Sequence, residues 1–312
     1  MNATPWNAWP APPDALGESP FWHPHEQRLY WVDVPGRRLR RASADGADAQ
    51  AWDMPSEPGC IAPAASGGLV VALRDGIYRA REWGGALARL AAAPHDTATT
   101  RFNDGKADPL GRFWAGTIYE PRDARKAALY CLDARPGHGA SGGDATLRFQ
   151  LGDAITANGL AFSPDAGTLY WADTPGHVIR AWDWDPQHNS LRNERVLRAF
   201  DAKPAGWAPG QPGYGGRPDG AAVDLEGNYW CAMFEGARLV QLSPAGELLR
   251  ELPLPARCPT MPCLGGEDGR TLYVTTARAG RPADELQAFP ASGQVLWTRV
   301  DVPGLPVNFF ID

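Results

Sequence analysis

Alternating apolar positions around a short turn predict a β-hairpin in the middle of the chain. Residues 157–162 (ANGLAF) alternate in character, residues 163–167 (SPDAG) contain turn-forming Pro, Asp and Gly, and residues 168–173 (TLYWAD) form a second, aromatic run. Two such runs separated by a turn of this composition are typical of paired antiparallel strands. We therefore predict a hairpin over residues 157–173.

The same hairpin pattern recurs along the whole sequence. Six copies start near Glu18, Cys60, Asn103, Asn158, Asp219 and Met261, at intervals of 42, 43, 55, 61 and 42 residues. A period of roughly 40 to 50 residues with several strands in each repeat is typical of a β-propeller. The sequence therefore predicts an all-β fold, a six-bladed β-propeller with four antiparallel strands per blade, as a single domain over residues 1–312.

Four segments lie outside this repeat. Residues 1–15 contain four prolines, and we expect a lead-in that lies across a blade edge. Residues 135–143 and 203–216, rich in small residues, Gly and Pro, explain the two long intervals as insertions. The second insertion ends just before Asp219, and it is interpreted either as a lid or substrate wall or as a surface excursion. Residues 295–300 are predicted to form an edge strand.

Equivalent positions of a propeller's repeats lie on one ring around its central channel. Four of the six ring residues carry side-chain oxygen: Glu18, Asn103, Asn158 and Asp219. Two carboxylates and two amides on a narrow axis are costly to bury unless a cation neutralises them. Oxygen ligands without thiol or imidazole favour Ca²⁺, Mg²⁺ or Mn²⁺ over a dedicated zinc cage. A catalytic cation with positions open to substrate is one interpretation, and a structural cation that closes the channel is the other.

Arg101 extends this ring. It lies two residues before Asn103 and points the same way if the segment is a strand. Its planar guanidinium, with several donors, suits the oxygen atoms of a polar ligand. A solvated loop is the alternative interpretation of this charged segment.

The amino-acid composition limits the class of protein and the kinds of molecule that it could bind. An apolar fraction of 44% with 13 Trp is ample for a core, and 30 Pro with 35 Gly fit a β protein with many turns. A net charge of −6 without a basic patch argues against nucleic acid as a partner. We find no basic leader followed by an apolar run and no stretch of 18 apolar residues, so we expect a soluble cytoplasmic protein without a membrane partner.

The sequence gives little support for a disulfide framework, a zinc site, a nucleophilic serine or a nucleotide site. The five cysteines are too few and too irregular for a disulfide framework, Cys258 and Cys263 lack a second pair for zinc, and Cys60 is expected to be buried. His23 and His25 would share a strand face, but they fall where other repeats turn, which favours a structural role over metal ligation. The sequence contains no G-x-S-x-G elbow, no phosphate-binding P-loop and no H-E-x-x-H helix.

Four motifs resemble one known family. They are residues 17–22 (GESPFW), 101–117 (RFNDGKADPLGRFWAGT), 158–165 (NGLAFSPD) and 218–220 (PDG). In this order they resemble the SMP-30/gluconolactonase/regucalcin family over nearly the whole chain, except for residues 304–312. The resemblance implies a six-bladed propeller that hydrolyses sugar lactones with one divalent cation.

The resemblance also assigns roles to residues. Glu18, Asn158 and Asp219 match the family's metal ligands, and Arg101, Asn103 and Glu120 match its substrate-binding residues. Ca²⁺ is the favoured cation, with Mg²⁺, Mn²⁺, Fe²⁺ and Zn²⁺ as alternatives.

The expected activity is hydrolysis of an aldono-1,4- or 1,5-lactone to the aldonic acid, by a hydrolase acting on carboxylic ester bonds in carbohydrate metabolism. The cation would polarise the lactone carbonyl, and Asp219 would orient or deprotonate the attacking water. Arg101, Asn103 and Glu120 would hold the ring hydroxyls. Two other classes stay open. A metal-dependent esterase or organophosphate hydrolase would need a more apolar mouth, and a non-catalytic calcium-binding propeller would bind a partner without turnover.

Overall fold

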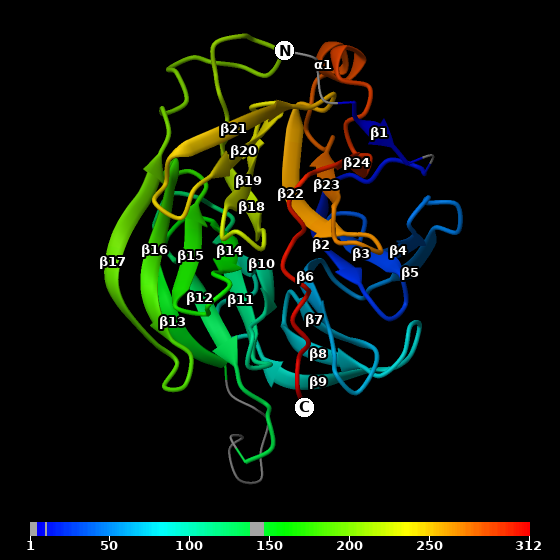
Figure 1. Ribbon diagram of the computed structural model, residues 1–312, viewed down its shortest axis with the longest axis vertical. Coiled ribbons are helices and arrows are strands. Elements are labelled where there is room, and N and C mark those ends of the chain that lie inside the picture. The colour runs from blue at the N-terminus through cyan, green and yellow to red at the C-terminus, as the bar shows by residue number, and fades with distance from the viewer. Residues whose placement is uncertain (1–4, 10, 138–146) are drawn as a thin grey trace.

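The computed structural model describes residues 5–9, 11–137 and 147–312. Six four-stranded antiparallel sheets are arranged radially as the blades of an all-β propeller (Figure 1). The predicted fold class is therefore confirmed. Most of the predicted insertion at 135–143 falls outside the described residues. None of the described helices is long and apolar enough to cross a membrane.

Each blade has four strands, which follow one another from the channel outward. Blade one contains β2 (Gly17–His23), β3 (Arg28–Asp33), β4 (Arg38–Ser43) and β5 (Gln50–Asp53). Blade two contains β6 (Pro58–Pro63), β7 (Leu69–Leu73), β8 (Gly76–Ala80) and β9 (Leu87–Ala92). Blade three contains β10 (Thr100–Ala107), β11 (Phe113–Tyr119), β12 (Ala127–Leu132) and β13 (Leu147–Ala154). Blade four contains β14 (Ala157–Phe162), β15 (Thr168–Asp173), β16 (Val178–Asp185) and β17 (Ser190–Ala199). Blade five contains β18 (Arg217–Val223), β19 (Tyr229–Phe234), β20 (Arg238–Leu242) and β21 (Leu248–Pro253). Blade six contains β22 (Cys258–Gly265), β23 (Thr271–Ala277), β24 (Leu296–Arg299) and β1 (Asn7–Ala8).

Burial falls from the inner to the outer strands of a blade. Every residue of β2, β6, β14 and β22 is buried, whereas β17 and β21 are mostly exposed or half-buried. The reason is that a neighbouring blade covers each face of an inner strand, while an outer strand meets solvent. Among the described residues, six apolar clusters fill the interfaces between neighbouring blades. The innermost strands thus form a rigid wall around the channel.

The N-terminal strand closes the ring. Asn7 and Ala8 of β1 pair with Trp297 and Leu296 of β24, and β24 in turn pairs with β23. Residues 296–299 form a strand within the predicted segment 295–300, but its predicted edge position is wrong, because β1 covers β24 and occupies the edge itself. The closure is reinforced by Trp9, which is buried among blade-one and blade-six side chains. One short helix among the described residues, α1 (Ala283–Ala288), lies between β23 and β24.

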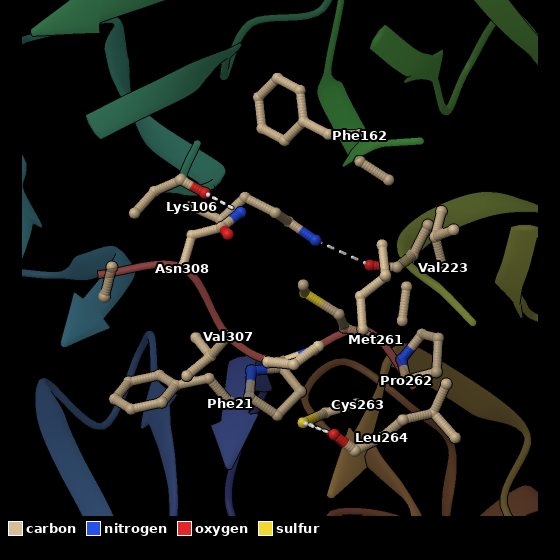
Figure 2. Close-up of a pocket in the computed structure, with 18 of the residues that line it drawn as sticks. Phe21, Lys106, Phe162, Val223, Met261, Pro262, Cys263, Leu264, Val307 and Asn308 are labelled. Atoms are coloured by element: carbon tan, nitrogen blue, oxygen red, sulfur yellow. Dashed lines mark hydrogen bonds between the residues drawn. The ribbon is translucent and has the colours of Figure 1, made fainter. Parts of the chain in front are cut away.

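The C-terminal segment, residues 304–312, crosses one end of the channel. It begins at blade five, where the Leu305 amide donates to the Val223 carbonyl (3.2 Å), and it ends at blade two, where the Phe310 amide donates to the Pro63 carbonyl (2.8 Å). Figure 1 shows it as a red trace across the middle of the molecule. Between these anchors it covers a cavity of about 320 Å³, with Val307 facing the space in Figure 2. We call residues 304–312 the C-terminal strap.

The histidine and cysteine positions agree with structural roles. His23 is buried, and its ring packs at 5.5 Å, edge to face, on Phe309 of the C-terminal strap. All five cysteines are free and buried, including Cys258 and Cys263.

Candidate functional site

The oxygen-bearing ring residues lie near the beginning of four inner strands. Glu18 is on β2, Asn103 on β10, Asn158 on β14 and Asp219 on β18. In each of these strands the pairing register shifts at this level: between Glu18 and Phe21, Phe102 and Gly105, Asn158 and Ala161, and Pro218 and Ala221. Such bulges re-aim side chains and are common beside active sites. In these four blades the repeated bulge turns one polar side chain towards the channel.

Aspartates on the second strands fix the start of two inner strands. The Asp33 carboxylate accepts a hydrogen bond from the Leu16 amide (3.1 Å), and Asp173 accepts one from the Thr156 amide (3.2 Å). Leu16 and Thr156 stand two residues before Glu18 and Asn158. The same contact therefore sets the entry of the strands that carry Glu18 and Asn158.

The backbone at Gly159 also requires its residue type. Its φ of +61° is left-handed, and a Cβ there would lie 2.3 Å from the Tyr229 hydroxyl. That hydroxyl donates to the Gly159 carbonyl (2.7 Å), which ties β14 to the neighbouring blade directly after Asn158.

Five of the six predicted site residues line one small cavity of about 90 Å³: Glu18, Arg101, Asn103, Asn158 and Asp219. Asn158 connects the others, because its Nδ2 donates to Asp219 Oδ1 (2.6 Å) and to Thr174 Oγ1 (2.7 Å). Its Oδ1 accepts from Asn103 Nδ2 (2.7 Å). The structure thus brings together side chains that are up to two hundred residues apart in sequence.

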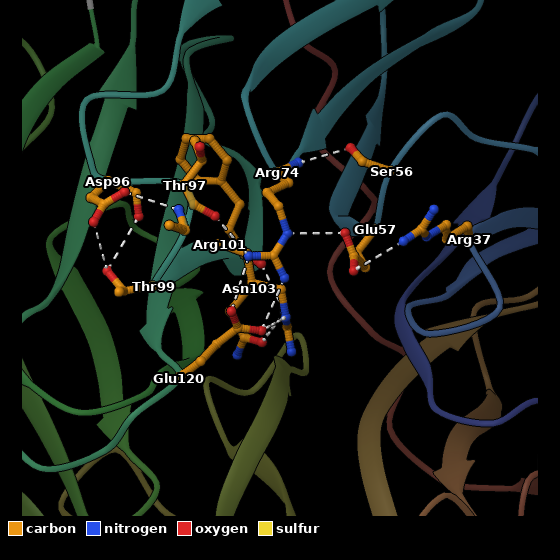
Figure 3. A network of polar contacts seen from close by, with 12 residues as sticks. Arg37, Ser56, Glu57, Arg74, Asp96, Thr97, Thr99, Arg101, Asn103 and Glu120 are labelled. Atoms are coloured by element: carbon orange, nitrogen blue, oxygen red, sulfur yellow. Dashed lines mark hydrogen bonds and ion pairs between the residues drawn. The ribbon is translucent and has the colours of Figure 1, made fainter.

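Glu120 lies outside the cavity lining. Both of its carboxylate oxygens accept hydrogen bonds from Arg74 (2.9 and 3.0 Å), and Arg74 also donates to Glu57 at 3.0 Å (Figure 3). The Glu120 carboxylate is 3.7 Å from Arg101 Nε. Arg101 in turn donates to Asn103 Oδ1 at 3.0 Å. Glu120 therefore stands behind Arg101, and its direct contact with a substrate stays a prediction.

Two carboxylates in the cavity are deeply buried without a hydrogen-bonded cation. Glu18 and Asp219 are 8% and 6% exposed. Burial raises the pKa of Glu18 well above its usual value, and the charges of Asp219 and Asp104 raise it further. Burial also raises the pKa of Asp219, which the charge of Arg217 opposes. This accumulation of negative charge is unfavourable in a dry site unless a cation is present.

The donor set fits a divalent cation with oxygen ligands. Among the described residues, no three His, Cys, Asp or Glu side chains are grouped to hold a metal ion. A cation at this ring would therefore need the amide oxygen of Asn158 as its third ligand beside Glu18 and Asp219, a set of hard oxygen donors. That oxygen now accepts from Asn103 Nδ2, which also donates to the Ala157 carbonyl (3.0 Å). If Asn158 turned its oxygen towards a cation, Asn103 Nδ2 would still have the Ala157 carbonyl as its hydrogen-bond acceptor.

The other two ring positions take no part. Cys60 is fully buried, and Met261 lines the strap-covered cavity at the other end of the channel. The inner-strand residues that line that cavity mostly follow the ring positions, whereas those that line the small cavity stand at or before them. The site and the C-terminal strap therefore occupy opposite ends of the channel.

Sequence reasoning missed two arginines and the third buried carboxylate. Arg217 and Arg122 line the small cavity with the predicted residues. Arg217 carried a signal, because it precedes Asp219 by two positions as Arg101 precedes Asn103; Arg122 sits in a loop with no periodicity. Asp104 is 4% exposed, and its Oδ1 has no hydrogen-bond partner among the described residues.

The insertion at 203–216 does not contribute to the cavity lining. It is held against neighbouring blades instead. The Tyr214 hydroxyl lies 2.6 Å from His177 Nε2, and the Gly210 amide donates to Glu285 (2.7 Å).

Comparison with known proteins decides the family. The model of the SMP-30/Gluconolactonase/LRE-like region matches residues 16–278. The chain belongs to this family. It is 44% identical over 298 residues to a 6-deoxy-6-sulfogluconolactonase of Pseudomonas putida, with 96% of each chain covered. It is 32% identical to a regucalcin of Danio rerio, with 93% of each covered.

Solved structures of the family share its fold. The calcium-binding protein regucalcin from Agrobacterium tumefaciens superimposes with a TM-score of 0.85 over 99% of this chain and 98% of that chain, at 22% identity. The family therefore contains regucalcins and sugar lactonases on the same propeller.

Proposed function

We propose that this chain is a divalent-cation-dependent lactonase that hydrolyses a sugar lactone to the corresponding aldonic acid. The observation that carries the proposal is the pair of buried carboxylates, Glu18 and Asp219, which share a small polar cavity with Asn158. The close relation to a named sugar lactonase supports the reaction class.

The proposed cation would be held by Glu18, Asn158 and Asp219, with Ca²⁺ as the first candidate. When bound, it would polarise the lactone carbonyl and favour negative charge on the carbonyl oxygen. The three ligands come from blades one, four and five.

Asp219 is the proposed general base. Among the described residues only Asn158 donates to its carboxylate, and it does so at Oδ1. Oδ2 is therefore free to orient the attacking water and to accept its proton. The proton then passes from the carboxyl group to the alkoxide oxygen of the opened ring or to solvent.

Arg101 and Asn103 are the proposed contacts for the sugar hydroxyls. Their side chains line the cavity and are joined to each other at 3.0 Å, so the guanidinium is pre-oriented. Glu120 and Arg74 support Arg101 from behind, and a direct contact of Glu120 with the sugar is part of the proposal.

The polar lining separates this function from the alternatives. Three arginines, two carboxylates and two asparagines line the cavity, beside only a few apolar side chains such as Phe234. A polyhydroxylated lactone matches this lining better than an apolar ester or organophosphate. A cation that only closed the channel would not need Arg101 and Asn103 arranged beside it.

The experiment measures lactone hydrolysis after removal of metal. Protein is stripped with a chelator and assayed on glucono-, galactono-, xylono- and arabinono-lactones by acid release, with the spontaneous rate subtracted. Turnover should disappear and should return with one or more of Ca²⁺, Mg²⁺, Mn²⁺, Fe²⁺ and Zn²⁺.

Variants locate the activity in the cavity. Asp219→Asn should stay inactive in every metal, because it removes both the base and a ligand charge. The matched control is Asp183→Asn, an exposed carboxylate on β16 that pairs with Arg195 far from the cavity. Undiminished turnover by the stripped protein, or by Asp219→Asn, would refute the proposal.

A further inference from the structure

An excess of arginine surrounds the site although the chain as a whole has a net charge of −6. Arg101, Arg122 and Arg217 all line the small cavity. A neutral sugar lactone would use one guanidinium for its hydroxyls, as proposed for Arg101. The other two have no evident partner in that reaction.

Arg217 points into the same layer of the channel as Arg101. It stands on β18 two residues before Asp219, and both side chains line the small cavity. Arg101 bears the same relation to Asn103 on β10. Two guanidinium groups from blades three and five therefore form a level just outside the proposed cation ligands.

The guanidinium of Arg217 is incompletely satisfied. Its Nε is buried and has no hydrogen-bond partner in the part of the chain that the structure describes. Among the described residues its one ion pair runs from Nη2 to Glu235 Oε2 at 3.4 Å. Glu235 is already engaged by Lys203 at 2.5 Å and by Arg281 at 2.9 Å, so Arg217 is its most distant partner.

The surrounding ion pairs do not neutralise the rim. Around Glu235 and Glu285 the structure places three cations: Lys203, Arg217 and Arg281. Around Glu57 and Glu120 it places another three: Arg37, Arg74 and Arg101. Arg122 is exposed at the rim, and its side chain makes no ion pair among the described residues. Each cluster thus has one more cation than it has carboxylates. The charges of Arg101 and Arg217 also act on Glu18 and Asp219, the carboxylates that the proposed cation would neutralise.

We infer that Arg217, with Arg122 at the rim, forms an oxyanion subsite that binds a tetrahedral sulfonate or phosphate group carried by the lactone. This inference rests on the proposed function and names its substrate class, a sugar lactone with a fixed negative charge remote from the carbonyl. The planar fork of Arg217 presents its free Nε–H to one anionic oxygen, and such charge-assisted bonds are stronger than bonds to a hydroxyl.

The test compares charged and neutral lactones on the same protein. Wild-type enzyme, loaded with the metal that supports turnover, is assayed on 6-deoxy-6-sulfogluconolactone, 6-phosphogluconolactone and gluconolactone. We expect a higher kcat/KM on one of the two anionic lactones than on gluconolactone, and the better of these identifies sulfonate or phosphate as the natural group. A preference for gluconolactone would overturn the inference.

Variants assign the subsite. Arg217→Gln should lower kcat/KM on the preferred anionic lactone by about 10- to 100-fold, as expected for a lost bond to a charged group, and should lower kcat/KM on gluconolactone by a clearly smaller factor, so that the preference for the anionic lactone falls. Arg217→Lys should recover part of the loss, because it keeps the charge and loses the fork. Arg122→Gln should cost about two- to fivefold, since its charge is exposed. The control is Arg195→Gln on the outer strand β17, which should change neither substrate.

Equal losses of Arg217→Gln on charged and neutral lactones would show that Arg217 serves the shared part of the substrate, and no loss on either would show that it is not a contact. Both results overturn the inference.

Calorimetric binding of 6-deoxy-6-sulfogluconate, 6-phosphogluconate and gluconate tests the oxyanion subsite separately from the proposed function. If no lactone is hydrolysed but an anionic acid binds more tightly than gluconate, the subsite stands and the lactonase proposal fails.

Discussion

The C-terminal strap offers a quantitative test of how this propeller is held together. Phe310 is fully buried against blade-two and blade-three side chains, in the same cluster as Phe113. Its neighbour Phe309 is half-buried and packs on the rings of His23 and His25. The two phenylalanines follow each other in the chain and differ in burial, so comparing their alanine variants measures the effect of burial for one residue type.

Phe310→Ala should destabilise the protein strongly. Removing a fully buried phenylalanine side chain costs about 3–5 kcal/mol, from lost transfer free energy and the cavity left behind. With an unfolding entropy of about 2 cal/mol/K per residue, a chain of 312 residues loses about 1.5 °C per kcal/mol, so Tm should fall by about 5–8 °C.

Differential scanning calorimetry measures this shift directly, and Phe309→Ala is the control. That variant should lower Tm by less than half as much, because its ring keeps solvent contact in the native state. Equal shifts for the two variants, or no shift for Phe310→Ala, would show that the strap lies on the propeller without contributing to its core.

Three further predictions concern stability and the site. Burial raises the pKa of Asp14 to about 6. Because this pKa of the folded state lies above that of the unfolded state, Asp14 stabilises the fold at low pH, and this contribution is lost as the pH rises through 6. Wild type should therefore lose about 2.4 kcal/mol between pH 4 and 7 relative to Asp14→Asn in chemical denaturation. Gly159→Ala should abolish activity and lower Tm, because its Cβ meets the Tyr229 hydroxyl, whereas Gly206→Ala, with a positive φ but open space, should cost only about 1 kcal/mol. Ca²⁺ at a hundred times its dissociation constant should stabilise wild type by about 2.7 kcal/mol and Glu18→Gln by much less, and equal stabilisation would place the cation elsewhere.

The parts of the fold that repeat could be predicted, because the same alternation and turn recur in every blade. Glu18, Asn158 and Asp219 occupy one position of that repeat, so the period alone places them on one ring. The aromatic second strands, with Trp31 and Trp171 buried in the structure, follow from the same pattern.

The parts that the sequence did not predict depend on contacts without a period. β1 contains two residues, too few to show alternation, yet it completes blade six by pairing with β24 nearly three hundred residues away. The C-terminal strap is irregular and is fixed by isolated backbone hydrogen bonds to several blades. The orientation of Glu120 depends on Arg74 of another blade, which no local pattern encodes.

The distribution of the proposed ligands over the blades connects these closures to the proposed site. Glu18 belongs to blade one, whereas Asn158 and Asp219 belong to blades four and five, so no single blade contains the site. The distance across the ring between Glu18 and Asp219 is set by every blade interface between them and by the seal of blade six. β1 joins the two ends of the chain and the C-terminal strap links blade five to blade two, so both hold the ring on which the spacing of these carboxylates depends. A propeller can therefore hold a precise ligand set on inner strands and leave its loops free to vary in substrate choice.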